Sequence, residues 1–155
     1  MNIEIRKGTQ KDIPSALNLV KELAAYEKAP NEVEVTVTEM TEWGFGSDKQ
    51  FDFYVALLDG IIVGMALYYF KYSTWKGKCL FLEDIIVTES QRGKGLGKLL
   101  FDKVVEVSKE MKVRRMEWQV LDWNTPAIEF YKKYYANLDG EWVNCKLTNH
   151  QLEKM

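Results

Sequence analysis

The dipeptide Asp59-Gly60 joins two long apolar runs, residues 53–58 and residues 61–72. An Asp-Gly pair between strand-like runs is the strongest short signal for a two-residue β-hairpin turn, because both residues tolerate positive φ. A second turn at Lys76-Gly77-Lys78 leads into another run, residues 79–87. Because these runs are almost continuously apolar, we expect central strands that are covered on both faces.

Helical patterns flank this strand-rich middle. Behind Thr9, which stands three residues before Asp12 as in a capping box, apolar residues recur at helical spacing up to about Tyr26. Other patterns predict strands over residues 3–6, 116–121 and 141–147, and helices over residues 38–43, after Gly97 and over 126–134. No linker or repeat divides the 155 residues. We therefore expect a single domain over residues 1–155, of mixed α/β (α+β) class, with helices on both sides of a largely antiparallel sheet.

Charge and cysteine content exclude several classes of function. The chain has 21 basic and 23 acidic side chains, a net charge of −2, so bulk charge does not favour nucleic acid or anionic membrane as a partner. No apolar run is long enough to span a membrane, and the amino terminus lacks the pattern of a secretory signal, so we expect a cytoplasmic protein. Cys79, Cys145 and the single His150 are too scattered to predict a metal site.

A glycine-rich segment, Gln91-Arg92-Gly93-Lys94-Gly95-Leu96-Gly97-Lys98, lies between a predicted strand and a predicted helix. Alternating glycines allow backbone N–H groups to converge on one point, and the N-terminus of the helix adds its own N–H groups and dipole. With Arg92, Lys94 and Lys98 beside it, such a turn suits a pyrophosphate. The spacing fits neither the Walker pattern nor the dinucleotide GxGxxG pattern. A glycine turn that merely begins a helix is the alternative.

This segment resembles the coenzyme signature Q/RxxGxG/A of the GNAT superfamily of N-acetyltransferases. Further segments are similar, in order and spacing, to the diamine (spermidine/spermine) and thialysine N-acetyltransferases, from residue 3 to about residue 147. They are Lys21-Glu22-Leu23-Ala24-Ala25-Tyr26-Glu27, Gly44-Phe45-Gly46, Tyr68-Tyr69-Phe70, Trp75-x-Gly77-Lys78, Leu82-Glu83-Asp84 and Trp123-Asn124-x-Pro126-Ala127-Ile128-x-Phe130-Tyr131-Lys132.

The resemblance implies acetyl transfer from acetyl-CoA to a primary amine, on a sheet that is splayed in the middle, in a homodimer without a metal. It assigns the coenzyme to the backbone of Ile85, Ile86 and Val87, to the turn formed by Arg92, Gly93, Lys94, Gly95, Leu96, Gly97 and Lys98, and to Asn124, Thr125, Pro126 and Ala127 across the splay. It assigns the amine pocket to Tyr26, Glu27, Glu83, Glu117, Trp118 and Gln119, and makes Tyr131 the general acid.

The chemistry of the reaction gives these residues roles. A primary alkylamine has a pKa near 10.4, so at neutral pH it arrives as a cation and must lose a proton before it attacks. Glu83 is the candidate base, directly or through water, and Tyr131 is the candidate proton donor to the departing thiolate. Alternatively, Glu83 is an outward-facing strand residue and Tyr131 is aromatic packing. We expect Asp84 to be structural and paired with the backbone.

Two departures from the family pattern leave the acceptor open. Ser73 stands where polyamine enzymes typically carry an aspartate, two residues before Trp75, and Tyr135 stands where the family usually has a glycine. The acceptor could be thialysine, a diamine or a polyamine. A peptide or protein amine is the alternative acceptor, and a coenzyme A sensor without turnover is the alternative function. Glu27, Glu32, Glu34, Glu39 and Glu42 form either a solvated acidic face or an attractor for polycations.

Overall fold

The computed structural model describes residues 1–155, which form two compact units, residues 1–119 and residues 120–155. The first unit contains a five-stranded sheet in the order β1-β2-β3-β4-β5. The strands are β1 (Ile3–Lys7), β2 (Asp52–Leu58), β3 (Ile61–Ser73), β4 (Gly77–Val87) and β5 (Arg115–Glu117). β1 to β4 pair antiparallel, and β5 runs parallel to β4. The predicted mostly antiparallel sheet is confirmed.

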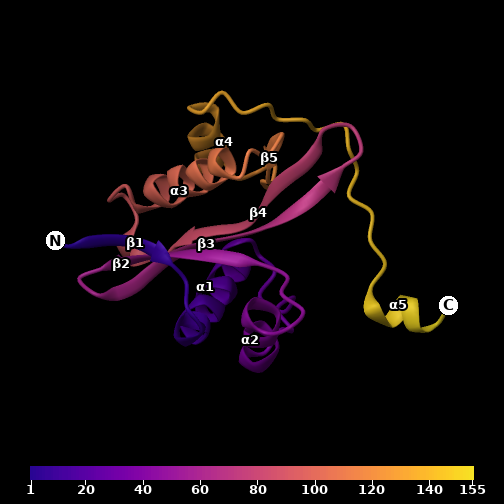
Figure 1. Ribbon diagram of the computed structural model, residues 1–155, viewed down its shortest axis with the longest axis horizontal. Coiled ribbons are helices and arrows are strands. Elements are labelled where there is room, and N and C mark those ends of the chain that lie inside the picture. The colour runs from indigo at the N-terminus through magenta and orange to yellow at the C-terminus, as the bar shows by residue number, and fades with distance from the viewer. The chain divides into compact units, whose positions relative to one another are not determined.

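Helices cover both faces of this sheet, as the sequence predicts. Helices α1 (Ile13–Tyr26) and α2 (Val37–Phe45) lie on one face, and α3 (Leu96–Glu110) lies on the other (Figure 1). Two short 3₁₀ turns, η1 (Gln10–Asp12) and η2 (Glu89–Gln91), precede α1 and the glycine-rich segment. The order of strands and helices therefore agrees with the mixed class read from the sequence.

Local sequence signals account for the hairpin between β2 and β3 and for the start of α1. Asp59 and Gly60 both adopt positive φ, 50° and 80°, so the hairpin between β2 and β3 forms as predicted. Asp12 accepts hydrogen bonds from the backbone N–H of Thr9 at 2.8 Å and from the Arg6 guanidinium at 2.7 Å. These bonds fix the chain at the start of α1 and hold the pKa of Asp12 at about 2, chiefly through the bond from Arg6.

Apolar packing on both faces explains the uninterrupted apolar sequence of β3. On the face of α1, Ile13 and Leu17 pack in one buried cluster with Met65 of β3. On the other face, Leu100 of α3 approaches so closely that a Cβ added at Gly64 would lie 3.2 Å from it. Strands buried on both sides need apolar residues at successive positions rather than at alternate ones.

The sheet is irregular on both edges of β4. In the pairing of β3 with β4, Leu67 lies opposite Asp84 and Tyr68 lies opposite Leu82, so Glu83 is an extra residue without a partner. This is a β-bulge, which bends a strand and redirects a side chain. On its other edge β4 pairs with β5 only as far as Phe81, opposite Glu117. Beyond that point the sheet opens, in agreement with the predicted splay.

The second unit differs most from the sequence-based expectation. It contains α4 (Thr125–Lys132) and α5 (Asn149–Glu153) and no strand. The predicted strand over residues 141–147 is wrong, because no residue of this segment belongs to a strand of the sheet. The predicted strand over residues 116–121 is also wrong in extent, because β5 ends at Glu117. None of the helices is both long enough and apolar enough to cross a membrane.

Candidate active site

The open edge of β4 exposes backbone groups beside the bulge. The N–H of Thr88 donates to the carbonyl of Val63 on β3 at 2.8 Å. In an antiparallel pair the direction of these groups alternates along the strand, so Ile86 also faces β3, whereas the N–H and C=O of Ile85 and Val87 face the opening. The Ile86 side chain is buried in the core. Two backbone N–H groups are thus presented where the splay begins.

The glycine-rich turn follows directly and leads into α3. Gly93 and Gly95 have φ of 80° and 81°, and Gly95 is the N-cap of the helix. A Cβ at either glycine would meet nothing within 4 Å, so it is the left-handed backbone conformation that favours glycine here. The first N–H groups of a helix have no intrahelical acceptor. The turn therefore has the left-handed glycines and the helix N-terminus on which the predicted anion-binding nest depends.

Arg92 lies between this turn and the end of α1. Its Nε donates to the carbonyl of Val87 at 2.9 Å, and its guanidinium lies 5.1 Å from the ring centre of Tyr26, the last residue of α1. The other two cations have carboxamide or carboxylate partners: Lys94 Nζ donates to Gln91 at 2.6 Å and Lys98 Nζ to Asp102 at 2.6 Å. Arg92 thus joins the predicted coenzyme turn to the predicted amine pocket.

Glu22 of α1 makes a second connection, which the sequence did not reveal. Its carboxylate accepts hydrogen bonds from the hydroxyl of Thr88, at 3.0 Å and 2.9 Å, and from the backbone N–H of Glu89 at 2.9 Å. These bonds fix the chain between β4 and the glycine turn against α1. The only sequence signal is the position of Glu22 within the motif that ends at Tyr26-Glu27.

Three carboxylates gather on the α1 side of the bulge. Glu83 accepts a hydrogen bond from the Tyr69 hydroxyl at 3.4 Å, and Glu27 follows the end of α1, where burial raises its pKa. Asp84 is half-buried; burial, then the charges of Glu83 and Glu27, raise its pKa to about 7. The carboxylate of Asp84 accepts no hydrogen bond, so the expected pairing of this side chain with the backbone is not observed. A carboxyl group that titrates near neutrality is typical of functional sites.

The carboxylate of Glu117 lies at the end of β5 between two cations. Lys71 Nζ lies 3.2 Å from its Oε1, and Arg115 Nε lies 2.9 Å from its Oε2. Burial alone would raise the pKa of Glu117, but these two partners outweigh burial and lower it. The next residue, Trp118, packs edge-to-face on Phe101 of α3 at 5.2 Å. Of the predicted pocket residues on this segment, Glu117 therefore faces the α1 side and Trp118 the α3 side.

The remaining predicted site residues belong to the second unit. Asn124 caps α4, where its Oδ1 accepts a hydrogen bond from the N–H of Ala127 at 3.4 Å, and Pro126 lies in the first turn. Tyr131 lies in the last turn of this helix, next to the ring of Phe130 at 5.5 Å between centroids. Within this unit, a capped helix therefore carries the predicted coenzyme contacts at one end and the predicted acid at the other.

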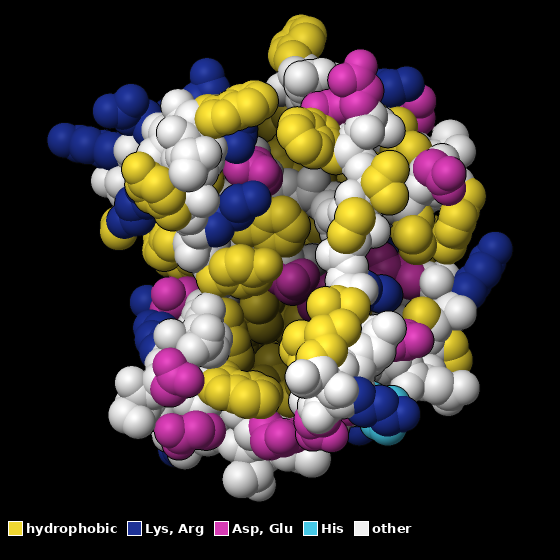
Figure 2. Space-filling model, turned by 90° about the vertical axis from the view of Figure 1, so that its right-hand side faces the viewer, with side chains coloured by type: hydrophobic (Ala, Val, Ile, Leu, Met, Phe, Trp, Pro, Cys, Tyr) yellow, Lys and Arg dark blue, Asp and Glu magenta, His cyan; other side chains and the backbone are white.

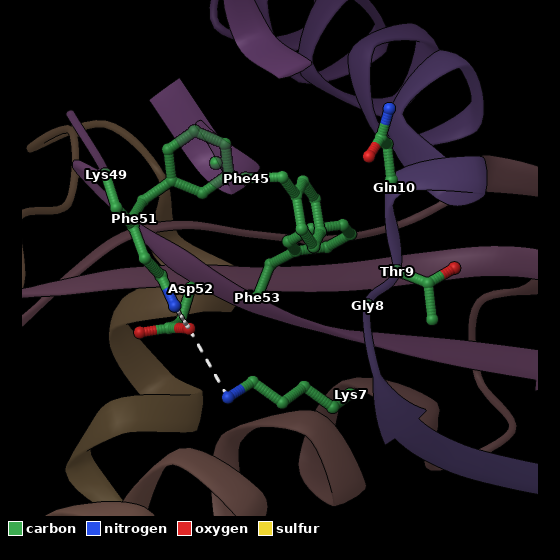
Figure 3. Close-up of a pocket in the computed structure, with 10 residues that line it drawn as sticks. Lys7, Gly8, Thr9, Gln10, Phe45, Lys49, Phe51, Asp52 and Phe53 are labelled. Atoms are coloured by element: carbon green, nitrogen blue, oxygen red, sulfur yellow. Dashed lines mark ion pairs between the residues drawn. The ribbon is translucent and has the colours of Figure 1, made fainter. Parts of the chain in front are cut away.

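An acidic patch around α2 and a cavity at the ends of β1 and α2 are further features of the surface. Acidic side chains gather along the lower edge of the face in Figure 2, at the level of α2 in Figure 1. Four exposed carboxylates flank or belong to α2: Glu32, Glu34, Glu39 and Glu42. A cavity of about 300 Å³ at the ends of β1 and α2 contains no predicted site residue. Figure 3 shows its phenylalanine rings, with Lys7 and Lys49 both reaching Asp52.

Comparison with known proteins decides the family. Residues 17–135 match the model of the acetyltransferase (GNAT) family. The chain belongs to the acetyltransferase (GNAT) family. This acetyltransferase is 37% identical to the thialysine N-epsilon-acetyltransferase of Bos taurus, over 92% of its own length and 90% of that relative. It is 33% identical to the human spermidine/spermine N(1)-acetyltransferase-like protein 1, over 83% of its length and 19% of that longer protein.

Solved structures agree with the fold of the acetyltransferase. An integron cassette protein from Vibrio cholerae superposes with a TM-score of 0.80 at 21% identity, over 99% of this chain and 97% of that one. The family uses acetyl-CoA as cosubstrate, and the acetyltransferase is accordingly an enzyme that transfers an acetyl group to an amine. No group of three or more His, Cys, Asp or Glu side chains is placed to hold a metal ion.

Proposed function

We propose that this acetyltransferase acetylates a primary amine of a small amine, either thialysine, a diamine or a polyamine, by direct attack through a tetrahedral intermediate. The observation that carries the proposal is the bulge in β4. It brings Glu83 and Asp84 next to the point where Ile85 and Val87 face the opening. Cation-attracting carboxylates and acetyl-binding N–H groups thereby lie a few residues apart. The acceptors named for the two relatives above support small amines.

The coenzyme has a complementary surface in both units. We assign the pantetheine arm and the acetyl group to the β4 backbone at residues 85–87, and the pyrophosphate to the turn at residues 93–98 with Arg92. The left-handed glycines and the N-terminus of α3 support this assignment. Residues 124–127 contribute from the second unit, where Asn124 caps α4.

The reaction needs three proton transfers, two from the nitrogen and one to the sulfur, and one anion-stabilising contact. The ammonium of the acceptor loses a proton to Glu83, directly or through water, and its nitrogen attacks the thioester carbonyl carbon. An N–H group at the open edge, from Ile85 or Val87, stabilises the oxyanion. The intermediate collapses with cleavage of the C–S bond, and the Tyr131 hydroxyl protonates the departing thiolate. The nitrogen loses its second proton to the resulting Tyr131 phenolate, directly or through water, which yields the neutral amide and restores the tyrosine. Tyr26, Glu27 and the segment Glu117–Gln119 complete the amine pocket.

A cytoplasmic homodimer is the assembly we propose. Large apolar side chains of the second unit, including Trp142, Val143 and Leu147, are exposed in the single chain. Exposed apolar groups clustered within six residues are typical of a protein–protein contact. The cytoplasmic location rests on the sequence alone.

Thiol release from acetyl-CoA tests the proposed function. The amines to compare are thialysine, lysine, putrescine, spermidine, spermine and a lysine-containing peptide. We expect turnover of small amines and a loss of roughly 10²-fold in kcat for Tyr131→Phe. Tyr134→Phe removes a hydroxyl just beyond the same helix and is the matched control. Exclusive turnover of the peptide would refute the acceptor class, and an unchanged kcat for Tyr131→Phe would refute the assigned acid.

A further inference from the structure

One face of the sheet extends from the bulge to β5 as a continuous row of side chains. Tyr69 lies opposite Phe81, and Phe81 lies opposite Glu117. Paired residues project from the same face, as do alternate residues along a strand, so Lys71 shares this face with Tyr69. The hydrogen bond from Tyr69 places the Glu83 carboxylate there as well. At the far end of this row, the mechanism above uses Glu117 only as part of the amine pocket and gives Lys71 no role.

That far end carries an excess of positive charge. Two cations, Lys71 and Arg115, share the single carboxylate of Glu117. The other partners of Arg115 are not carboxylates: its Nη2 donates to the hydroxyl of Ser73 at 3.2 Å, and Cys79 is a further hydrogen-bond partner. Lys71 and Arg115 side chains are each 39% exposed, so a ligand can reach them. One full positive charge is therefore uncompensated, and a second ammonium from a diamine would be repelled.

Between the two ends lies an apolar surface. The rings of Tyr69 and Phe81 lie 5.5 Å apart at an interplanar angle of 30°, and Lys71 Nζ lies 5.5 Å from the Phe81 ring centre. The order along the face is thus carboxylate, aromatic rings, and then a carboxylate flanked by two cations. An acidic end, an apolar middle and a zwitterion-complementary end match an amino acid with a side-chain amine.

We propose that Lys71 and Arg115 bind the α-carboxylate of an amino-acid acceptor while Glu117 holds its α-ammonium, so that the side-chain amine is presented at Glu83. The proposal rests on the proposed function and names the acceptor class within it. The side chain of the acceptor lies over the rings of Tyr69 and Phe81.

The lengths agree. Glu83 and Phe81 are two residues apart on β4, or about 7 Å at a rise of roughly 3.3 Å per residue. Phe81 is in register with Glu117, which lies on the neighbouring strand. In an extended lysine-like side chain, five bonds separate the terminal nitrogen from the α-carbon and span about 6 Å, given single bonds of about 1.5 Å. With a strand spacing of about 4.8 Å added, Glu83 and Glu117 lie about 8 Å apart along the diagonal. Since a polar contact of about 3 Å is made at each end, an acceptor of the length of thialysine reaches from Glu83 to Glu117.

Two amines that differ only by a carboxylate test the subsite. Thialysine and bis(2-aminoethyl) sulfide have the same chain, and the sulfide lacks the carboxylate. We expect kcat/KM of the wild type to favour thialysine by tenfold or more. Lys71→Gln should lower kcat/KM for thialysine about tenfold and raise it for the sulfide, because the excess positive charge that repels the second ammonium is removed. Ser73→Asp should neutralise the excess charge beside Arg115 and move the preference toward the sulfide.

Lys78→Gln is the matched control, because Lys78 lies on the adjacent strand with its Nζ over Phe70 at 4.4 Å. It removes the same charge from the other face of the sheet and should leave the preference unchanged. Equal kcat/KM for the two amines, or equal losses for both in Lys71→Gln, would overturn the carboxylate subsite.

Calorimetric binding to the coenzyme A complex separates this proposal from the proposed function. If neither amine is turned over, the assigned acceptor class fails, and the binding of the two amines still decides the subsite. Tighter binding of thialysine that is lost in Lys71→Gln supports the subsite, and equal binding overturns it.

Discussion

Asp84→Asn offers the most direct test of the electrostatics at the bulge. The folded protein holds the pKa of Asp84 at about 7, against an ordinary value of 3.8, because the group is half-buried beside Glu83 and Glu27. Folding therefore disfavours the ionised carboxylate. Between pH 3.8 and pH 7 the unfolded chain is ionised at this residue while the folded chain keeps its proton, and the resulting penalty grows with pH and is constant above about 7.

The magnitude follows from the two pKa values. Their difference corresponds to about 4 kcal/mol as an upper limit. Because Asp84 remains partly exposed and solvent screens its charge, we expect roughly half, about 2 kcal/mol. Asn has the same shape without the charge, so Asp84→Asn should raise the free energy of unfolding by about 2 kcal/mol at pH 8 and should have little effect near pH 4.

Urea denaturation of both proteins between pH 4 and pH 8 measures this difference. Glu110→Gln, at an exposed carboxylate at the end of α3, is the control for the loss of one surface charge. A pH-independent difference for Asp84→Asn, or a variant less stable than the wild type at pH 8, would refute the reasoning. Either result would mean that ionisation of the Asp84 carboxylate does not lower the free energy of unfolding.

Three further changes test other parts of the first unit and the end of α4. Asp12→Asn should lower the free energy of unfolding by about 2 kcal/mol at pH 7, because the folded pKa of Asp12 is about 2. In urea titrations this loss of stability should vanish as the pH falls from 4 toward 2. A loss that persists at pH 2 would contradict the ion-pair explanation. Tyr135→Gly should raise the free energy of unfolding by about 1 kcal/mol, since this 96% exposed residue has a φ of 59°. A variant that is less stable in urea denaturation would contradict this. Arg92→Ala should raise the Kd of coenzyme A about tenfold by calorimetry without changing which amine is preferred, and an unchanged Kd would exclude a contact with the coenzyme.

Local signals predicted the parts of the fold that local interactions determine. The hairpin at Asp59-Gly60 needs only two residues that tolerate positive φ, and both adopt it. Helix α1 follows from apolar spacing and the Thr9–Asp12 contact, and ends at Tyr26 as predicted. The glycine-rich turn was recognised because left-handed backbone and a helix N-terminus leave a direct mark on the sequence.

Features that depend on pairing between distant strands were missed. The bulge at Glu83 has no glycine or other marker, so nothing in Leu82-Glu83-Asp84 showed that both carboxylates would share a face or that Asp84 would lack a hydrogen bond. The cluster of Lys71, Arg115 and Glu117 depends on the register of β4 with β5. These two strands are neighbours in the sheet but are separated in the sequence by α3. Residues 141–147 carry a strand-like pattern, but a strand also needs a neighbouring edge.

The position of Arg92 has a consequence for how each of the two ligands affects the affinity for the other. Its guanidinium is held by the Val87 carbonyl and lies against the Tyr26 ring, so it contacts the end of β4, where we propose that the coenzyme binds, and the end of α1 at once. A phosphate group that orders Arg92 also orders Tyr26. We therefore expect the amine to bind more tightly to the coenzyme-loaded enzyme, and the coenzyme to gain the same factor from the amine, because coupling between two sites is reciprocal. Calorimetric titrations in either order should close this thermodynamic cycle.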